Sequence, residues 1–243
     1  MTISSPQNEK LKLVRKLRDR KHREREGLFA TEGEDLVEAG LAAGAEPRFV
    51  LTAAGSGLPE GWGGEEVEPE LLASVSSLGS GTRALAVWPL GWVERPLAPC
   101  VYLHGVSDPG NVGTIIRTAE ALIGSCVVLG PGCADPYSPK AIRASMGSIF
   151  AQPPVRAGFE ATREPRAALV AHGGAGLGAL SGAATICLGA ERDGLPAEVL
   201  AACEVRATIP LHGTAESLNV AAAAAIACER LSSPAMSEAR PDA

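Results

Sequence analysis

The sequence predicts an α/β protein made of two units, a small one at the N-terminus and a larger one with a parallel sheet. Beyond residue 100, short apolar segments alternate with amphipathic helical segments, which is the pattern of a parallel sheet covered on both faces. Residues 94–99 contain two prolines that interrupt regular structure and separate this region from the one before it. The length of 243 residues, with 46% apolar and 21% charged side chains, suits two globular domains.

The N-terminal unit, residues 1–95, is expected to be a compact α/β domain. Apolar residues at a spacing of three to four indicate its helices, and short apolar runs indicate its strands. Gly44 is a typical stop for the helix that precedes it, and the glycine-rich residues 55–64 predict a loop. The expected helices cover residues 10–25, 33–43 and 68–77, and the expected strands begin at Phe29 and cover residues 48–52 and 84–89.

The second unit, residues 96–232, alternates strand and helix throughout, and the polar residues 233–243 are expected to form a disordered tail. The expected strands cover residues 100–106, 125–130, 167–172, 184–189 and 205–210. The expected helices cover residues 112–123, 139–150, 196–202 and 217–231.

The net charge of −6 is distributed unevenly. Residues 10–25 hold nine Lys or Arg against Asp19 and Glu24, a local charge of +7, so the rest of the chain carries −13. A basic segment on an acidic body is typical of a local phosphate-binding surface, although a solvated helix face gives the same pattern. The motifs of the second unit favour the phosphate-binding interpretation.

Composition argues against several classes of protein. Aromatic residues make up only 4% of the chain, too few for RNA modules that stack bases on aromatic platforms. The six cysteines occur singly, without a C-x-x-C spacing, so we expect reduced core thiols and no metal. The longest apolar run, residues 220–228, is too short to span a bilayer, and the polar start is unlike a secretory signal. A cytoplasmic protein without a membrane partner is therefore expected.

Four polar blocks follow predicted strands of the second unit, at residues 108–120, 135–148, 188–195 and 209–220. In the first block, Gly110 and Gly113 permit close backbone approach, and Asn111 can donate and accept hydrogen bonds. Further along the same helix, Arg117 offers a rigid fork suited to a phosphate. Taken alone, this block is explained by an Asn-Gly turn with a surface arginine. The presence of the other three blocks favours a functional role for it.

The other three blocks supply a basic helix and a candidate ligand pocket. Lys140 and Arg143 lie three residues apart, so they share a helix face that could grip an RNA backbone; a solvated basic face is the alternative. The third and fourth blocks place small residues and main-chain amides at strand ends, where open α/β sheets bind ligands. Such loops suit an adenine held between apolar walls, although a strand–turn–helix packing junction gives a similar pattern.

Residues 174–179 fit the pattern G-x-G-x-x-A of dinucleotide-binding folds. That fingerprint has to open a crossover helix of about ten residues or more. Only residues 180–183 separate it from the next expected strand, so we interpret it as a glycine-rich surface loop.

Together the four blocks resemble the SpoU (TrmH-type) RNA ribose methyltransferases, and residues 21–33 resemble the opening of the substrate-binding domain fused to many of them. The resemblance implies a SPOUT-type catalytic domain with a trefoil knot, a homodimer with a shared active site, and S-adenosyl-L-methionine as cofactor. The reaction it implies is methyl transfer to a ribose 2′-hydroxyl of RNA.

The resemblance also implies the roles of individual residues. Arg117 and Asn111 correspond to the catalytic pair. The implied cofactor-binding residues are Gly189, Ala190, Glu191, Gly194, Ile209, Leu211, Ser217, Leu218 and Asn219. The RNA-binding residues predicted from the basic segment and the second block are Lys16, Arg20, Lys21, Arg23, Lys140, Arg143 and Ser145.

The role of Arg117 is open between two accounts. A guanidinium with a pKa above about 12 is a poor base at neutral pH, so alignment of the hydroxyl and stabilisation of the developing alkoxide is favoured over proton abstraction. The expected substrate is 23S rRNA, because domains of this N-terminal type usually accompany it in the family. A tRNA methyltransferase and a non-catalytic, RNA-binding ribosome assembly factor are the alternatives.

Overall fold

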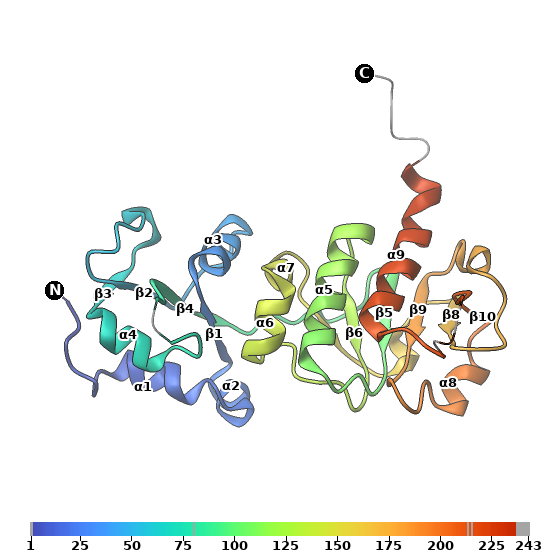
Figure 1. Cartoon of the computed structure of the whole chain (residues 1–243), viewed down its shortest axis with the longest axis horizontal. Coiled ribbons are helices and arrows are strands. Elements are labelled where there is room, and N and C mark those ends of the chain that lie inside the picture. The colour runs from blue at the N-terminus through green and yellow to red at the C-terminus, as the bar shows by residue number, and fades with distance from the viewer. Residues whose placement is uncertain (1, 80, 213, 215, 237–243) are drawn as a thin grey trace, which may run out of the picture. The chain divides into compact units, whose positions relative to one another are not determined.

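The computed structural model describes residues 2–79, 81–212, 214 and 216–236, with the side chains of 233–236 left aside (Figure 1). Two compact units make up the chain. The first comprises Met1–Gly91 and Tyr137–Ala151, and the second comprises Trp92–Pro136 and Gln152–Ala243. Residues 137–151 therefore belong to the first unit, although they lie in the sequence between two strands of the second.

The first unit has a four-stranded sheet in the order β1-β4-β2-β3. Strand β4 pairs antiparallel with both neighbours, whereas β2 and β3 are parallel. The strands are β1 (Leu28–Glu32), β2 (Phe49–Ala53), β3 (Glu65–Val67) and β4 (Ala84–Pro89). The helices are α1 (Glu9–Lys16), α2 (Arg20–Glu26), α3 (Glu34–Ala42) and α4 (Pro69–Val75), with α6 (Pro139–Ser145) and α7 (Ser148–Ala151) from the later segment.

The single helix predicted over residues 10–25 is two helices, because Asp19 starts a new one. Its side chain accepts a hydrogen bond from the Lys21 amide as the N-cap of α2. The buried Arg23 donates to the carbonyls of Leu17 (2.7 Å) and Arg18 (2.8 Å) at the end of α1. These carbonyls would otherwise lack a helical partner, so Arg23 holds the two helices at their junction.

The two faces of this sheet are covered by different helices. On one face, Leu85 and Val87 of β4 join a core that includes Leu11 of α1 and Leu72 of α4. On the other, Trp88 of β4 packs against the Phe150 ring at 4.8 Å between centroids. Phe29 of β1 likewise contacts the rings of Tyr137 and Phe150. The segment 137–151 therefore completes the core of the first unit.

The second unit has the predicted parallel sheet, so the α/β fold class is confirmed. Its strand order is β10-β8-β9-β5-β6-β7, and every pair is parallel. Helices α5 and α9 pack against each other beside β5 (Figure 1). The strands are β5 (Cys100–Leu103), β6 (Val127–Leu129), β7 (Val155–Arg156), β8 (Arg166–Leu169), β9 (Thr185–Leu188) and β10 (Val205–Ala207). The helices are α5 (Pro109–Ile123), α8 (Ala197–Ala201) and α9 (Val220–Met236). The family's knot stays a prediction.

Three further sequence expectations differ from the structure. The helix expected over residues 139–150 breaks at Met146 and Gly147, which adopt positive φ angles of 48° and 93° and separate α6 from α7. Helix α9 begins at Val220 instead of Ser217. It also continues to Met236, past the expected start of a disordered tail, and residues 237–243 lie outside the described part of the chain.

Two expectations on composition can be compared with the structure. All six cysteines are free thiols, as predicted, and burial raises the pKa of Cys100 to about 11 and of Cys228 to about 12. None of the helices in the described residues combines the length and the apolar character that a bilayer crossing requires.

Candidate functional site

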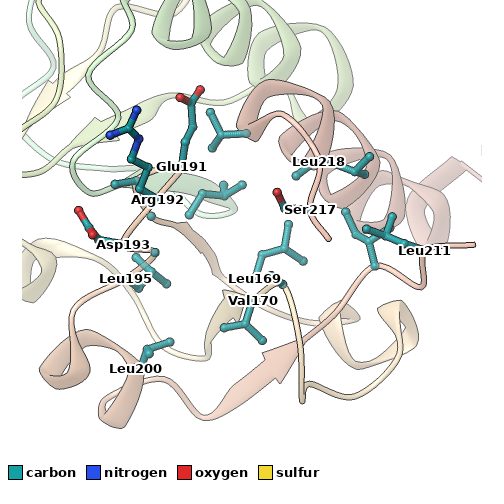
Figure 2. A pocket seen from close by; sticks show the side chains of 18 residues that line it. Leu169, Val170, Glu191, Arg192, Asp193, Leu195, Leu200, Leu211, Ser217 and Leu218 are labelled. Carbon is teal, nitrogen blue, oxygen red and sulfur yellow. The ribbon is translucent and has the colours of Figure 1, made fainter. Parts of the chain in front are cut away.

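A cavity of about 250 Å³ opens in the second unit at the carboxyl ends of β8, β9 and β10. Figure 2 shows aliphatic side chains around it, among them Leu169, Leu200 and Leu218. Eight of the nine predicted cofactor-binding residues line the cavity, and Asn219 is the exception. The eight are Gly189, Ala190, Glu191, Gly194, Ile209, Leu211, Ser217 and Leu218.

A tight loop after β9 forms one side of this cavity. The Ala190 amide donates to the Gly194 carbonyl (3.1 Å), and the Gly194 amide donates to the Ala190 carbonyl (3.0 Å). Gly194 has a φ of +67°, a conformation that glycine adopts without steric cost. Glu191, Arg192 and Asp193 are exposed at the tip (Figure 2). The loop therefore presents charged side chains at the edge of an aliphatic cavity.

Gly189 is required by the loop itself. A Cβ at this position would lie 2.1 Å from the carbonyl carbon of Gly194 and 2.3 Å from the Leu195 nitrogen. Both are main-chain atoms, so they cannot move aside as a flexible side chain would. The absence of a side chain at Gly189 thus allows the loop to close.

A row of hydrogen-bonded side chains connects three of the predicted motif blocks. The Asn219 amide donates to the Asn111 carbonyl oxygen (3.1 Å), and the Asn111 amide donates to the Glu191 carboxylate. Asn219 also caps α9, since its carbonyl oxygen accepts from the Ala221 amide (2.8 Å). The Asn111 side-chain nitrogen carries two N–H groups, and among the described residues it donates to one acceptor, the Glu191 carboxylate. One N–H is left to donate to a ligand.

Arg117 lies away from this row. It projects from α5 as an exposed side chain, and no hydrogen bond or ion pair joins it to another described residue. Nor is it among the residues that line the cavity. A single chain thus brings Asn111 to the predicted cofactor residues but leaves Arg117 separate from them.

The predicted RNA-binding residues are all in the first unit, and some of them are exposed whereas others are buried. Lys16, Arg20 and Lys21 are exposed on α1 and α2, with Arg20 paired to Glu24 at 3.0 Å. Arg23 is only 4% exposed and is engaged with the main chain. Ser145 is fully buried, and its hydroxyl donates to the Ile142 carbonyl (2.8 Å). The latter two side chains are therefore inaccessible to a nucleic acid in this structure.

On α6, Arg143 is half-buried and donates to the Ser77 hydroxyl (3.2 Å), and Lys140 also has a polar contact. The two remain on one helix, as the spacing of three predicted. They are contributed by the inserted segment 137–151, which is far in sequence from the basic helices of the same unit.

Sequence reasoning missed part of the cavity wall. Leu169 ends β8 and Val170 and Ala171 follow it, and β8 lies between β10 and β9 in the sheet. Their segment was predicted as a strand but not as part of the site, because the order of strands in a sheet is not readable from local patterns. The carboxyl end of β8 was the available signal, since ligands bind beyond such ends.

Comparisons with known proteins match both parts of the chain. Residues 98–229 match the model of the SpoU rRNA Methylase family, and residues 8–79 match that of the MRM3-like substrate binding domain. The chain is 34% identical over 238 residues to the 23S rRNA (guanosine(2553)-2′-O)-methyltransferase RlmP of Bacillus subtilis, covering 92% of this chain and 96% of that relative.

Two further proteins extend these matches. The 23S rRNA (uridine(2479)-2′-O)-methyltransferase of Streptomyces viridochromogenes is 33% identical over 133 residues, which is 49% of this chain and 46% of that protein. The crystal structure of the AdoMet-bound rRNA methyltransferase from Sinorhizobium meliloti superposes with a TM-score of 0.81 at 28% identity, covering 95% of this chain and 96% of the other.

Proposed function

The chain belongs to the SpoU rRNA methylase family and is an S-adenosylmethionine-dependent RNA 2′-O-ribose methyltransferase, and from this premise we propose that its substrate is 23S rRNA. The observation that carries this proposal is the likeness to the Bacillus subtilis 23S rRNA enzyme over 92% of the chain, including both units. A likeness confined to the catalytic unit would leave the RNA class open.

The cavity suits the cofactor that the family uses. Its walls are aliphatic, and charged side chains stand only at the loop tip, an arrangement that fits a molecule with a flat purine and a polar, charged tail. We assign the loop of Gly189, Ala190, Glu191 and Gly194 and the segment with Ile209, Leu211, Ser217 and Leu218 to cofactor binding, with Asn219 supporting them from the cap of α9. When bound, S-adenosylmethionine supplies an activated methyl group.

Asn111 is assigned the task of orienting the ribose beside the cofactor. Its amide is fixed by Asn219 on one side and Glu191 on the other, and an N–H remains to donate to a ribose oxygen. Because both neighbours belong to cofactor-binding segments, the same contacts would align the substrate with the cavity.

Arg117 is the second proposed catalytic residue. Its planar fork can hold a phosphate and the neighbouring hydroxyl together, and its charge stabilises an alkoxide as it develops. Within one chain Arg117 stands apart from the cavity, so we propose a homodimer in which Arg117 of one subunit completes the site of its partner. The exposed Leu122 at the end of α5, 38% accessible, is apolar surface that a partner could cover.

RNA binding is assigned to the first unit, which comprises residues 1–91 and 137–151 instead of the expected residues 1–95. The exposed cations Lys16, Arg20 and Lys21 form one basic surface, and Lys140 and Arg143 form a second. Arg23 and Ser145 support these surfaces from within, because both are buried and bonded to the main chain. The compartment proposed is the cytoplasm, where bacterial 23S rRNA is found.

The substrate assignment is tested by methylation of purified RNAs. The protein is incubated with radiolabelled S-adenosylmethionine and either unmodified 23S rRNA or a pool of unmodified tRNA. We expect label at one ribose of 23S rRNA, mapped by its resistance to alkaline cleavage. Labelling of tRNA alone would reassign the substrate, and binding of 23S rRNA without any transfer would favour the assembly factor.

A further inference from the structure

A carboxylate in the first unit holds a surface loop by several hydrogen bonds at once. Glu32 ends β1 and belongs to the stretch 21–33 that resembles a substrate-binding domain. Its two oxygens accept from the Ser77 amide (2.8 and 3.0 Å), the Leu78 amide (3.2 Å) and the Ser76 hydroxyl (3.0 Å). The loop that follows α4 is thereby fixed to the end of β1.

The loop is also braced internally. The Ser76 and Thr82 hydroxyls lie 2.6 Å apart, and the Leu78 amide donates to the Ser76 hydroxyl (3.0 Å). Ser76 and Thr82 are buried, whereas Ser77 and Leu78 are exposed, Leu78 to 51%. The buried hydroxyls of Ser76 and Thr82 therefore support the exposed residues Ser77 and Leu78, and the hydrogen bonds to Glu32 fix the position of these exposed residues.

The exposed edge reaches α6 through one hydroxyl. Ser77 donates its O–H to Glu32 (2.8 Å) and accepts an N–H from the Arg143 guanidinium (3.2 Å). Because the hydroxyl proton is committed to the carboxylate, the oxygen lone pairs face the guanidinium. Helix α6 packs against β1 in the same unit, so Arg143 on α6 lies close enough to Glu32 on β1 for the single residue Ser77 to connect them.

This arrangement leaves Arg143 with donors to spare. A guanidinium has five N–H groups, and the Ser77 hydroxyl takes one of them. In the described part of the chain no ion pair joins Arg143 to Glu32 or to another carboxylate. The intervening serine thus orients the guanidinium without occupying its fork, which a direct carboxylate contact would do.

We propose that Glu32 and Ser77 are positioning residues that orient Arg143 toward a phosphate of the RNA substrate. The proposal rests on the proposed function, since it needs an RNA ligand at α6. Glu32 and Ser77 act through Arg143 and need not touch the RNA.

The test measures affinity for unmodified 23S rRNA by filter binding over a series of salt concentrations, with the full-length protein. Arg143→Ala should weaken binding by on the order of tenfold and reduce the slope of log affinity against log salt by about one. Ser77→Ala should weaken it by about threefold, because the guanidinium keeps its charge but loses its orientation. The double variant should bind no more weakly than Arg143→Ala alone.

Three further variants separate positioning from general stability. Ser77→Thr retains the hydroxyl and should bind RNA like the wild type. Ser5→Ala is the matched control, because Ser5 is an exposed serine of the same unit whose hydroxyl accepts from the Gln7 amide. Glu32→Gln should behave like Ser77→Ala or worse, because an amide cannot accept from all four donors.

Additive losses in the double variant would overturn the proposal, and so would unchanged affinity in Ser77→Ala alongside weakened binding by Arg143→Ala. In both cases wild-type methylation of 23S rRNA would persist, and the proposed function would stand. A wild-type protein without affinity for 23S rRNA would overturn both.

Discussion

The two units hold their polar groups by different means. In the second unit, the predicted site is built by main chain and small residues at strand ends, and a missing side chain at Gly189 lets its loop close. In the first unit, the exposed cations stand on short helices, and buried polar side chains such as Arg23 hold the framework beneath them. The first arrangement depends on backbone position, whereas the second depends on the number and orientation of charges.

The comparison predicts different consequences of substitution. A change beside the cavity should alter the chemistry or the cofactor affinity and leave RNA binding unaffected. A change on the basic helices should alter RNA affinity by increments and leave cofactor binding unaffected.

Arg117→Ala should reduce methyl transfer on the order of 10²–10³-fold, because a preorganised charge contact to the reacting groups is lost. The exposed side chain has no described partner, so folding and cofactor affinity should stay at wild-type values. Arg117→Lys should recover little activity, since an ammonium lacks the planar fork. A single-turnover rate within a few-fold of wild type would remove Arg117 from the proposed site.

Leu218→Asp should weaken S-adenosylmethionine binding by roughly tenfold or more, since it places a charge against an aliphatic wall. Titration calorimetry measures the affinity, and RNA binding should be unchanged. Gly189→Ala is a poorer probe, because its Cβ would collide with the main chain of the loop and alter its shape as well.

Mixing Leu218→Asp with Arg117→Ala subunits should restore part of the activity if the site is shared between subunits. Two inactive preparations that stay inactive after subunit exchange would contradict the proposed dimer.

Arg23→Ala and Lys21→Ala test the comparison within the first unit, because the two residues lie two positions apart on α2 and differ in exposure: Arg23 is buried and Lys21 is exposed. Arg23→Ala should lower the free energy of unfolding by about 2 kcal/mol, as it leaves the Leu17 and Arg18 carbonyls without their donor. Lys21→Ala should leave stability within about 0.5 kcal/mol and reduce the salt dependence of RNA binding by roughly one phosphate contact. Thermal unfolding and filter binding measure the two effects. A destabilising Lys21→Ala with a harmless Arg23→Ala would reverse the assignment.

Local patterns were sufficient to predict most strands and helices of the fold. The strand over residues 84–89 has the predicted limits, and the helix expected over residues 112–123 ends at Ile123 as predicted but begins earlier, at Pro109. The sequence pattern does not show two helix breaks that depend on a single residue. Asp19 interrupts the predicted helix by acting as the N-cap of α2. Met146 adopts a left-handed conformation, which is uncommon for a methionine and therefore not expected from its residue type. Strand β7, of two residues, is too short to show a period.

The sequence motifs predict which residues belong to the candidate site, but they do not predict the contacts between those residues. Gly189 and Leu218 were named from their motif blocks and do line one cavity. The contact between Asn111 and Glu191 joins positions 80 residues apart, and nothing in either block reveals it. The prediction counts Arg23 among the RNA-binding side chains, whereas the structure buries it at a helix junction that the sequence pattern does not reveal.

The placement of residues 137–151 in the first unit has a consequence for biosynthesis. A ribosome makes the chain from its N-terminus, so β1 and β4 emerge well before the helices that cover one face of their sheet. Until Phe150 leaves the exit tunnel, the rings of Phe29 and Trp88 lack the partner that they have in the finished protein. The core of the first unit is therefore complete only after residues 137–151 have been synthesised, and in a nascent chain halted after residue 91 the rings of Phe29 and Trp88 would lack their contacts with Phe150.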